Sequence, residues 1–84
     1  MPWYDFLWSF EADGNVEHIA EHGLTTADVE DVVRNPLAVR VSRMTGRPIA
    51  VGWTSDGRLI LGVYELIDAV TVYPVTAYDI EVRP

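Results

Sequence analysis

Two stretches between residues 15 and 36 carry apolar side chains at helical spacing. In the first, Val16, Ile19 and Ala20 recur at intervals of three and four residues, which lines one side of a helix. In the second stretch, the same spacing is kept by Val29, Val32 and Val33. The pattern therefore predicts two short amphipathic helices in succession.

The residues around these stretches indicate where each helix begins and ends. Gly23 follows the first helix, at a position that favours a residue tolerant of the left-handed conformation. Thr25 or Thr26 begins the second helix, and Thr25 with Asp28 forms a variant of the capping box. Asn35-Pro36 ends it, because a residue before proline avoids the α region. Asp13 or Asn15 is the expected N-cap of the first helix.

Elsewhere the apolar positions alternate with a period of two, which is typical of strands. The expected strands are 3–10, 37–42, 49–54, 59–64 and 70–78, with Ser55-Asp56-Gly57 as a hairpin turn. Both faces of 59–64 are apolar, which predicts a central strand covered on both sides, at least in part. Pro74 has no N–H to donate, so the last strand is expected at an edge or bulged there.

The order of elements predicts an α+β fold made of one domain, residues 1–84. A strand and two helices come first, and a meander of four antiparallel strands follows. We expect both helices to pack on one face of a twisted antiparallel sheet.

Composition narrows the classes of site and the expected location of the protein. The chain has no cysteine, which excludes a disulfide or a zinc site built from thiolates. No apolar run approaches the roughly 18 residues of a membrane span, and the first residues lack the basic start of a signal peptide. A soluble, cytoplasmic protein is therefore expected, with no membrane partner.

The charge is distributed unevenly along a chain whose net charge is −7 and which has no lysine. Residues 1–31 contain eight acidic and no basic residues, whereas residues 32–58 contain five arginines and a single acid, Asp56. This asymmetry indicates an anionic partner for the middle segment, either a phosphate or a carboxylate. Ordinary solvated charges are the alternative interpretation.

Several of these residues together resemble the BrnT-like toxins of the RelE/ParE superfamily of bacterial toxin–antitoxin modules. The first helix has the form N-x-x-H-I-x-x-H-G, and the second has T-x-x-x-V-x-x-V with an Asn-Pro end. A turn of the form G-x-T-x-D-G-R follows at residues 52–58. The resemblance extends to about Tyr78, and it is also shared with a related group of small proteins of unknown function.

This resemblance implies a RelE/ParE-like fold and a toxin that cleaves RNA, usually messenger RNA on the ribosome, without a metal or other cofactor. It also implies a protein antitoxin as partner. The residues that it places on RNA phosphates or other anions are Arg40, Arg43, Arg47 and Arg58. Three of these, Arg43, Arg47 and Arg58, are expected to be catalytic, with His22 or Tyr64 assisting proton transfer. Tyr78 is an alternative residue for stacking on a base.

Two alternatives remain open at this point. The acidic balance favours a non-catalytic domain that keeps the fold and binds a protein partner. His18 and His22 match H-x-x-E-H, a motif of zinc peptidases, but the match is short and the chain offers no third ligand by motif. No metal is therefore predicted. An exposed aromatic patch around Trp3 and Tyr4 would indicate a partner surface or a homodimer.

Overall fold

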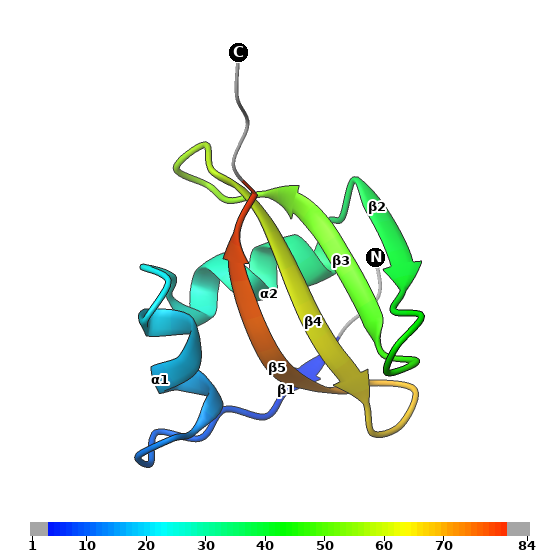
Figure 1. Ribbon diagram of the computed structural model, residues 1–84, viewed down its shortest axis with the longest axis horizontal. Coiled ribbons are helices and arrows are strands. Elements are labelled where there is room, and N and C mark those ends of the chain that lie inside the picture. The colour runs from blue at the N-terminus through cyan, green and yellow to red at the C-terminus, as the bar shows by residue number, and fades with distance from the viewer. Residues whose placement is uncertain (1–3, 81–84) are drawn as a thin grey trace.

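The computed structural model describes residues 4–80, which form a five-stranded sheet with two helices (Figure 1). In chain order the elements are β1 (Asp5–Phe6), α1 (Asn15–Ala20), α2 (Thr26–Arg34), β2 (Ala38–Val41), β3 (Pro48–Trp53), β4 (Leu59–Leu66) and β5 (Thr71–Asp79). The α+β prediction and the strand–helix–helix–meander order are confirmed. Within this range, no helix has both the length and the apolar character needed to cross a bilayer.

The sheet has the order β1-β5-β4-β3-β2. Strands β2 to β5 form the predicted antiparallel meander, in which Ala50 pairs with Gly62 and Gly62 with Ala77. Strand β1 runs parallel to β5, with Asp5 opposite Thr71. The expectation of an all-antiparallel sheet was therefore wrong. Parallel neighbours need a long connection, and here both helices and strands β2 to β4 lie between β1 and β5 in the chain.

The first strand is shorter than the alternation of aromatic residues predicted, and covers Asp5–Phe6 rather than the described part of 3–10. Beyond it, the Leu7 carbonyl and the Ser9 N–H bond to the side chain of Asn15 instead of to a strand. The Trp8 indole N–H donates to Glu30 on α2 at 2.8 Å. Packing against α2 therefore takes this segment out of the sheet. Trp3 lies outside the described residues.

The predicted helix ends are right at three of four positions. Thr25 caps α2 with the full capping box, and the helix ends at Asn35. Gly23 follows α1 with φ of +74°, as the left-handed conformation requires. The start of α1 differs, because Gly14 is its N-cap and neither Asp13 nor Asn15 caps it. The Asn15 side chain is instead buried and bonds to other segments.

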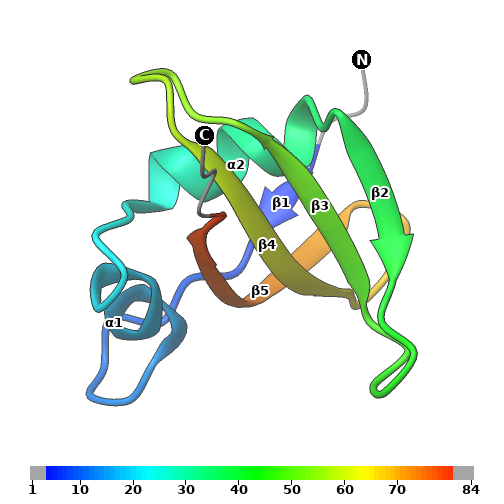
Figure 2. The ribbon, with the colours of Figure 1, turned by 45° about the horizontal axis from the view of Figure 1, so that its top comes forward.

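The core lies between α2 and one face of the sheet (Figure 2). Helix α2 contacts β3 and β4, whereas α1 contacts β5 and lies beside it (Figure 1). The expectation that both helices pack on one face is therefore only half right, since α1 lies along the part of β5 that β1 does not reach. Gly52 allows the close approach of α2, because an added Cβ would lie 3.3 Å from Val32 Cγ1. The buried apolar side chains are Ile19, Leu24, Val29, Val32, Val33, Ala50, Ile60, Tyr64, Val72 and Ala77.

The last strand contains the irregularity predicted from its proline. The register between β4 and β5 shifts between Val63 and Tyr64, which pair with Thr76 and Pro74 respectively. Val75 is thus the extra residue of a bulge. The Pro74 carbonyl accepts a hydrogen bond from Asn15 Nδ2 at 2.9 Å, so the bulge also fixes the start of α1.

Candidate functional site

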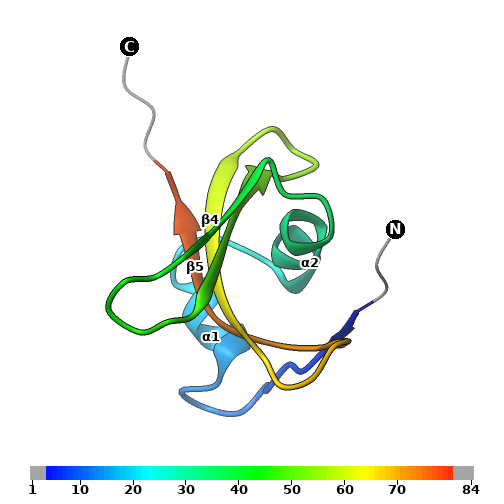
Figure 3. The same ribbon diagram turned by 90° about the vertical axis from the view of Figure 1, so that its right-hand side faces the viewer.

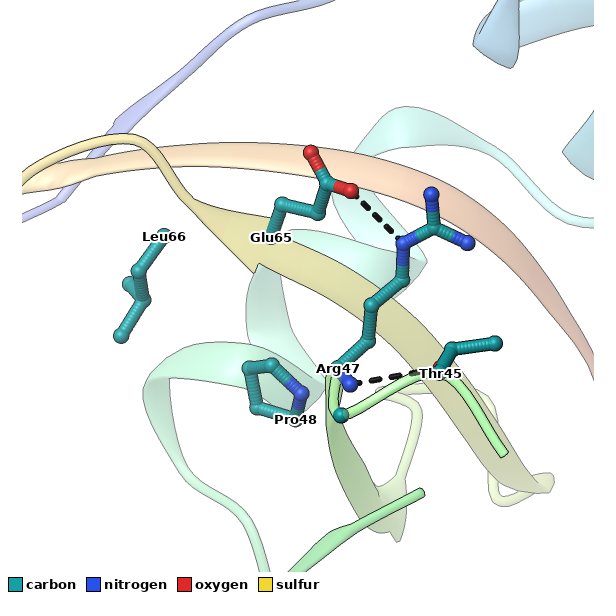
Figure 4. Close-up of a pocket in the computed structure, with 6 residues that line it drawn as sticks. Thr45, Arg47, Pro48, Glu65 and Leu66 are labelled. Atoms are coloured by element: carbon teal, nitrogen blue, oxygen red, sulfur yellow. Dashed lines mark hydrogen bonds and ion pairs between the residues drawn. The ribbon is translucent and has the colours of Figure 1, made fainter. Parts of the chain in front are cut away.

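Three arginines lie at the end of the sheet where β2 turns into β3. Arg40 is on β2 and Arg43 is in the turn; both are exposed, and within residues 4–80 neither forms an ion pair. Arg47 follows in the same turn, and its Nε donates to Glu65 Oε1 at 2.7 Å (Figure 4). Because Arg40 pairs with Ile49 and Ser42 N–H bonds to Arg47, the side chains of Arg40 and Arg47 share one face of the sheet. We call this surface, Arg40, Arg43 and Arg47, the arginine end.

A shallow pocket of about 330 Å³ lies at the arginine end, beside the Arg47–Glu65 pair. It opens to solvent and is lined by Thr45, Gly46, Arg47, Pro48, Glu65 and Leu66 (Figure 4). A guanidinium has five N–H donors, and its bond to Glu65 uses one of those of Arg47. The pocket therefore places an arginine that has unused N–H donors beside a carboxylate.

Arg58 lies elsewhere and is bound by acidic groups. Its guanidinium contacts Asp28 at 2.9 Å, Asp56 at 3.2 Å and Asp79 at 4.0 Å, and its Nη1 donates to the Gly23 carbonyl at 2.9 Å. These contacts connect the β3–β4 turn to the α1–α2 junction. Its hydrogen bond to Asp56 raises the pKa of the Arg58 guanidinium. The geometry indicates that Arg58 stabilises the fold, since three carboxylates already neutralise its charge.

His22 lies away from the arginine end, and Tyr64, although next to Glu65 in the chain, lies on the opposite face of the sheet. His22 is exposed at the end of α1, with its ring 6.0 Å from that of Tyr78. Tyr64 is buried in the core on the helix side of the sheet, and this burial raises the pKa of its hydroxyl. The six residues of β3 separate the two ends of the sheet by roughly 17 Å. The structure thus brings together Arg40, Arg43 and Arg47, and it holds His22, Arg58 and Tyr64 apart from them.

Sequence reasoning did not select Glu65 as a site residue. Its neighbour Tyr64 was selected, but the alternation along β4 places Tyr64 on the covered face and Glu65 on the other. Only the register can show that Glu65 lies beside Arg47, since the two residues are 18 positions apart. The same alternation along 59–64 was the available signal, because it assigns residues 61, 63 and 65 to one face.

The face of the sheet opposite α2 is apolar and partly accessible. We call it the open face; its members are Ile49, Val51, Trp53, Leu59, Leu61, Val63 and Tyr78. Trp53 is 54 % exposed, and the aliphatic members are half-buried. Figure 3 shows α2 on one side of β4. Strand β4 is central, as the sequence predicted for residues 59–64, and its cover on the open face is partial, since Leu59, Leu61 and Val63 are half-buried.

The histidine motif of α1 does not form a metal centre. His18 and His22 are both exposed, and among residues 4–80 no group of three histidine or acidic side chains gathers in a geometry that would hold a metal. A zinc site needs three or four protein ligands. The structure therefore gives no support to a hydrolase built on H-x-x-E-H.

Acid should destabilise the fold partly through Asp56. The hydrogen bond from the Thr54 hydroxyl, aided by Arg58, holds the pKa of Asp56 below its usual value of 3.8. A carboxylate with a lowered pKa stabilises the folded state above its unfolded pKa, and this contribution disappears as the pH falls through the folded pKa. The expected result is a stability that decreases below about pH 4, with a smaller decrease in Asp56→Asn.

Urea unfolding of both proteins between pH 2 and 6 measures this effect. Thr54→Val removes the hydroxyl that donates to Asp56, and should reduce the acid dependence in the same direction. An Asp56→Asn protein that keeps the full dependence would assign it to other carboxylates, of which Asp68 is the first candidate. Hydrogen bonds from Val70 N–H and Thr71 lower the pKa of Asp68 as well.

Comparison with known proteins gives no match: no family model, no curated protein and no solved structure is similar to this chain.

Proposed function

We propose that this chain is a toxin of the BrnT-like, RelE/ParE type, which cleaves RNA without a metal and is neutralised by a protein antitoxin. The observation that supports the proposal is the arginine end, where Arg40 and Arg43 are exposed beside the Arg47–Glu65 pair and an open pocket. The resemblance of the helix–Gly–helix segment to this superfamily supplies the expected substrate, messenger RNA, and the expected fold family.

The distribution of charge in space supports an anionic substrate at this end. Helix α1, with its acidic residues, lies on the side of the molecule away from the β2–β3 turn, and α2 runs behind the sheet (Figure 1). The net charge of −7 therefore does not describe the local field at the arginine end. Exposed guanidinium groups bind phosphate oxygens through paired N–H donors.

Cleavage of RNA without a metal needs a base for the ribose 2′-hydroxyl and a cation for the charge that develops on the phosphate. In this proposal, Glu65 accepts the proton of the 2′-hydroxyl, and the 2′-oxygen forms a bond to the phosphorus while the P–O5′ bond breaks. Arg47, whose Nε is 2.7 Å from Glu65, stabilises the charge that develops on the phosphate, and the leaving 5′-oxygen takes a proton from water. Arg40 and Arg43 bind the flanking phosphates. His22, Arg58 and Tyr64 take no part in this arrangement, because they lie at the other end of the sheet or in the core.

Expression in bacteria tests the proposal. Wild-type protein should arrest growth, and Glu65→Gln, which keeps the shape of the side chain, should relieve the arrest. We expect purified Glu65→Gln to cleave RNA about 100-fold more slowly in the presence of EDTA, since loss of a general base typically costs this much. Arg34→Ala is the matched control, because Arg34 pairs with Glu30 on α2 and should leave cleavage unchanged.

Full activity of Glu65→Gln would contradict the assigned role of Glu65. Normal growth at high soluble expression of the wild type, with no RNA cleavage in vitro, would contradict the toxin proposal as a whole.

The open face favours a second candidate function, a non-catalytic domain that binds a protein. A partly exposed apolar sheet face that includes Trp53 is typical of a binding surface. In this case wild-type protein would leave growth and RNA intact, and Trp53→Ala would weaken the complex with the protein partner. Arg34→Ala again serves as the control for a general loss of charge or stability.

A further inference from the structure

The outer edge of the sheet at β2 has no neighbouring strand among residues 4–80. At the opposite edge of the sheet, β1 and α1 lie beside β5. Strand β2 is the outermost strand on this side of the sheet (Figure 2). An open edge offers N–H and C=O groups to another strand, and proteins usually protect such edges with charged side chains, proline or a bulge. Within Ala38–Val41 the only such feature is Arg40.

The register shows which backbone groups the edge offers. Ser42 N–H donates to the Arg47 carbonyl at 2.8 Å, so these two residues form a hydrogen-bonded pair. Hydrogen-bonded and non-bonded pairs alternate along an antiparallel ladder. Arg40 therefore bonds to β3, and Val39 and Val41 direct their N–H and C=O groups away from the sheet. The backbone of two residues is thus free to pair with a further strand.

The side chains on this strand are unusually apolar for an exposed edge. Leu37, Val39 and Val41 are 66 %, 49 % and 67 % exposed. Val39 pairs with the buried Ala50, so it lies on the helix side of the sheet. Helix α2 contacts β3 and β4 but does not extend over β2. Three large aliphatic side chains are therefore exposed to water, and covering this apolar surface would be favourable in free energy.

We propose that β2 pairs antiparallel with β2 of a second copy of this chain, in a register centred on Val39. In this register the two Val39 residues face each other, and Val41 lies opposite the partner's Leu37. Every exposed aliphatic side chain of the edge then meets another. Each Arg40 lies opposite the partner's Ala38. The result is a two-fold dimer with one continuous sheet across both chains.

The other registers that use the free groups of Val39 and Val41 are less favourable. A register centred on Arg40 places the two arginines directly opposite each other, and like charges in that position are destabilising. A register centred on Val41 places Val39 opposite the partner's Arg43. The edge is therefore self-complementary in one register, and this selects a second copy of the chain as the occupant. The proposal does not depend on RNA cleavage or on an antitoxin.

Sedimentation of the full-length protein over a range of concentrations tests the association. We expect a monomer–dimer equilibrium, and Val39→Lys should raise the dissociation constant at least about tenfold, because it places two cations opposite each other. Trp53→Lys, on the open face, is the matched control and should leave the equilibrium unchanged. Wild-type protein that stays monomeric throughout, or a dimer lost in Trp53→Lys but kept in Val39→Lys, would overturn the proposal.

Single cysteines test the register even if Val39→Lys proves unstable, because the chain has no cysteine of its own. In a hydrogen-bonded antiparallel pair the Cα atoms are about 5.5 Å apart, which a disulfide spans. Val39→Cys should therefore cross-link into a covalent dimer on mild oxidation. Val41→Cys should stay largely monomeric under the same conditions, since its counterpart lies four residues along the partner strand. Cross-linking of Val41→Cys in preference to Val39→Cys would overturn the register.

Discussion

Replacement of Asn15 by alanine should destabilise the fold by about 3 kcal/mol, because three backbone groups lose their partners at once. The Asn15 side chain is 2 % exposed. Its Oδ1 accepts from Ser9 N–H at 2.7 Å, and its Nδ2 donates to the carbonyls of Leu7 and Pro74 at 2.8 and 2.9 Å. Alanine would leave all three groups without this partner, and the Pro74 carbonyl would lose it in a buried position.

The position of Asn15 explains why the loss should be large. One amide connects the end of the first strand segment, the start of α1 and the bulge of β5. Helix α1 has six residues, which is too short for a helix that is stable by itself. Removing its anchor should therefore release the whole helix from β5 as well as cost the hydrogen bonds.

Thermal and urea unfolding measure the effect, and a loss of about 3 kcal/mol corresponds to a melting temperature roughly 15 °C lower in a domain of this size. Asn35→Ala is the matched control. Asn35 is exposed after α2, and its loss should change the stability by no more than about 0.5 kcal/mol. Similar losses in both variants would show that the Asn15 bonds are not the anchor described here.

Ile60→Ala should be destabilising to a similar degree, by about 3 kcal/mol, because Ile60 is fully buried near the start of β4. Truncation would remove apolar contacts and leave a cavity below α2. The adjacent Leu61 points to the open face and is only half-buried. Leu61→Ala should therefore cost about 1 kcal/mol, since less apolar area returns to water.

Urea unfolding of the two variants under the same conditions measures the difference between the faces of one strand. Equal losses of unfolding free energy in Ile60→Ala and Leu61→Ala would mean that the open face is covered in solution. That outcome would place an interface on the open face, and it would also remove the observation that favours the second candidate function.

The sequence indicated the fold class and most elements, since these depend on local patterns. The spacing of Val29, Val32 and Val33 determines which side of α2 is buried, and the cap at Thr25 depends on neighbours in the chain. Pro74 predicted the irregularity of β5 because proline has no N–H. The first strand was predicted too long, because the alternation of its aromatic residues does not show that Trp8 bonds to α2.

The candidate site was less predictable than the fold. The arginines were selected as a group from their position in the chain, which does not distinguish Arg58, bound by Asp28, from Arg47, which lies beside a pocket. The sequence contained no direct sign that Glu65 would lie next to Arg47. Pairing between residues on different strands depends on the register, and the register depends on turns and on the bulge.

The sequence by itself determined the helices, the meander and the separation of acidic from basic segments. Each of these follows from the order of residues that are close in the chain. Only the tertiary structure decided the parallel return of β1, the role of Asn15 as an anchor, the open face and the free edge of β2. These features depend on which groups are left without partners after the sheet and helices have packed. The set of unpaired groups is a property of the whole fold and not of any segment within it.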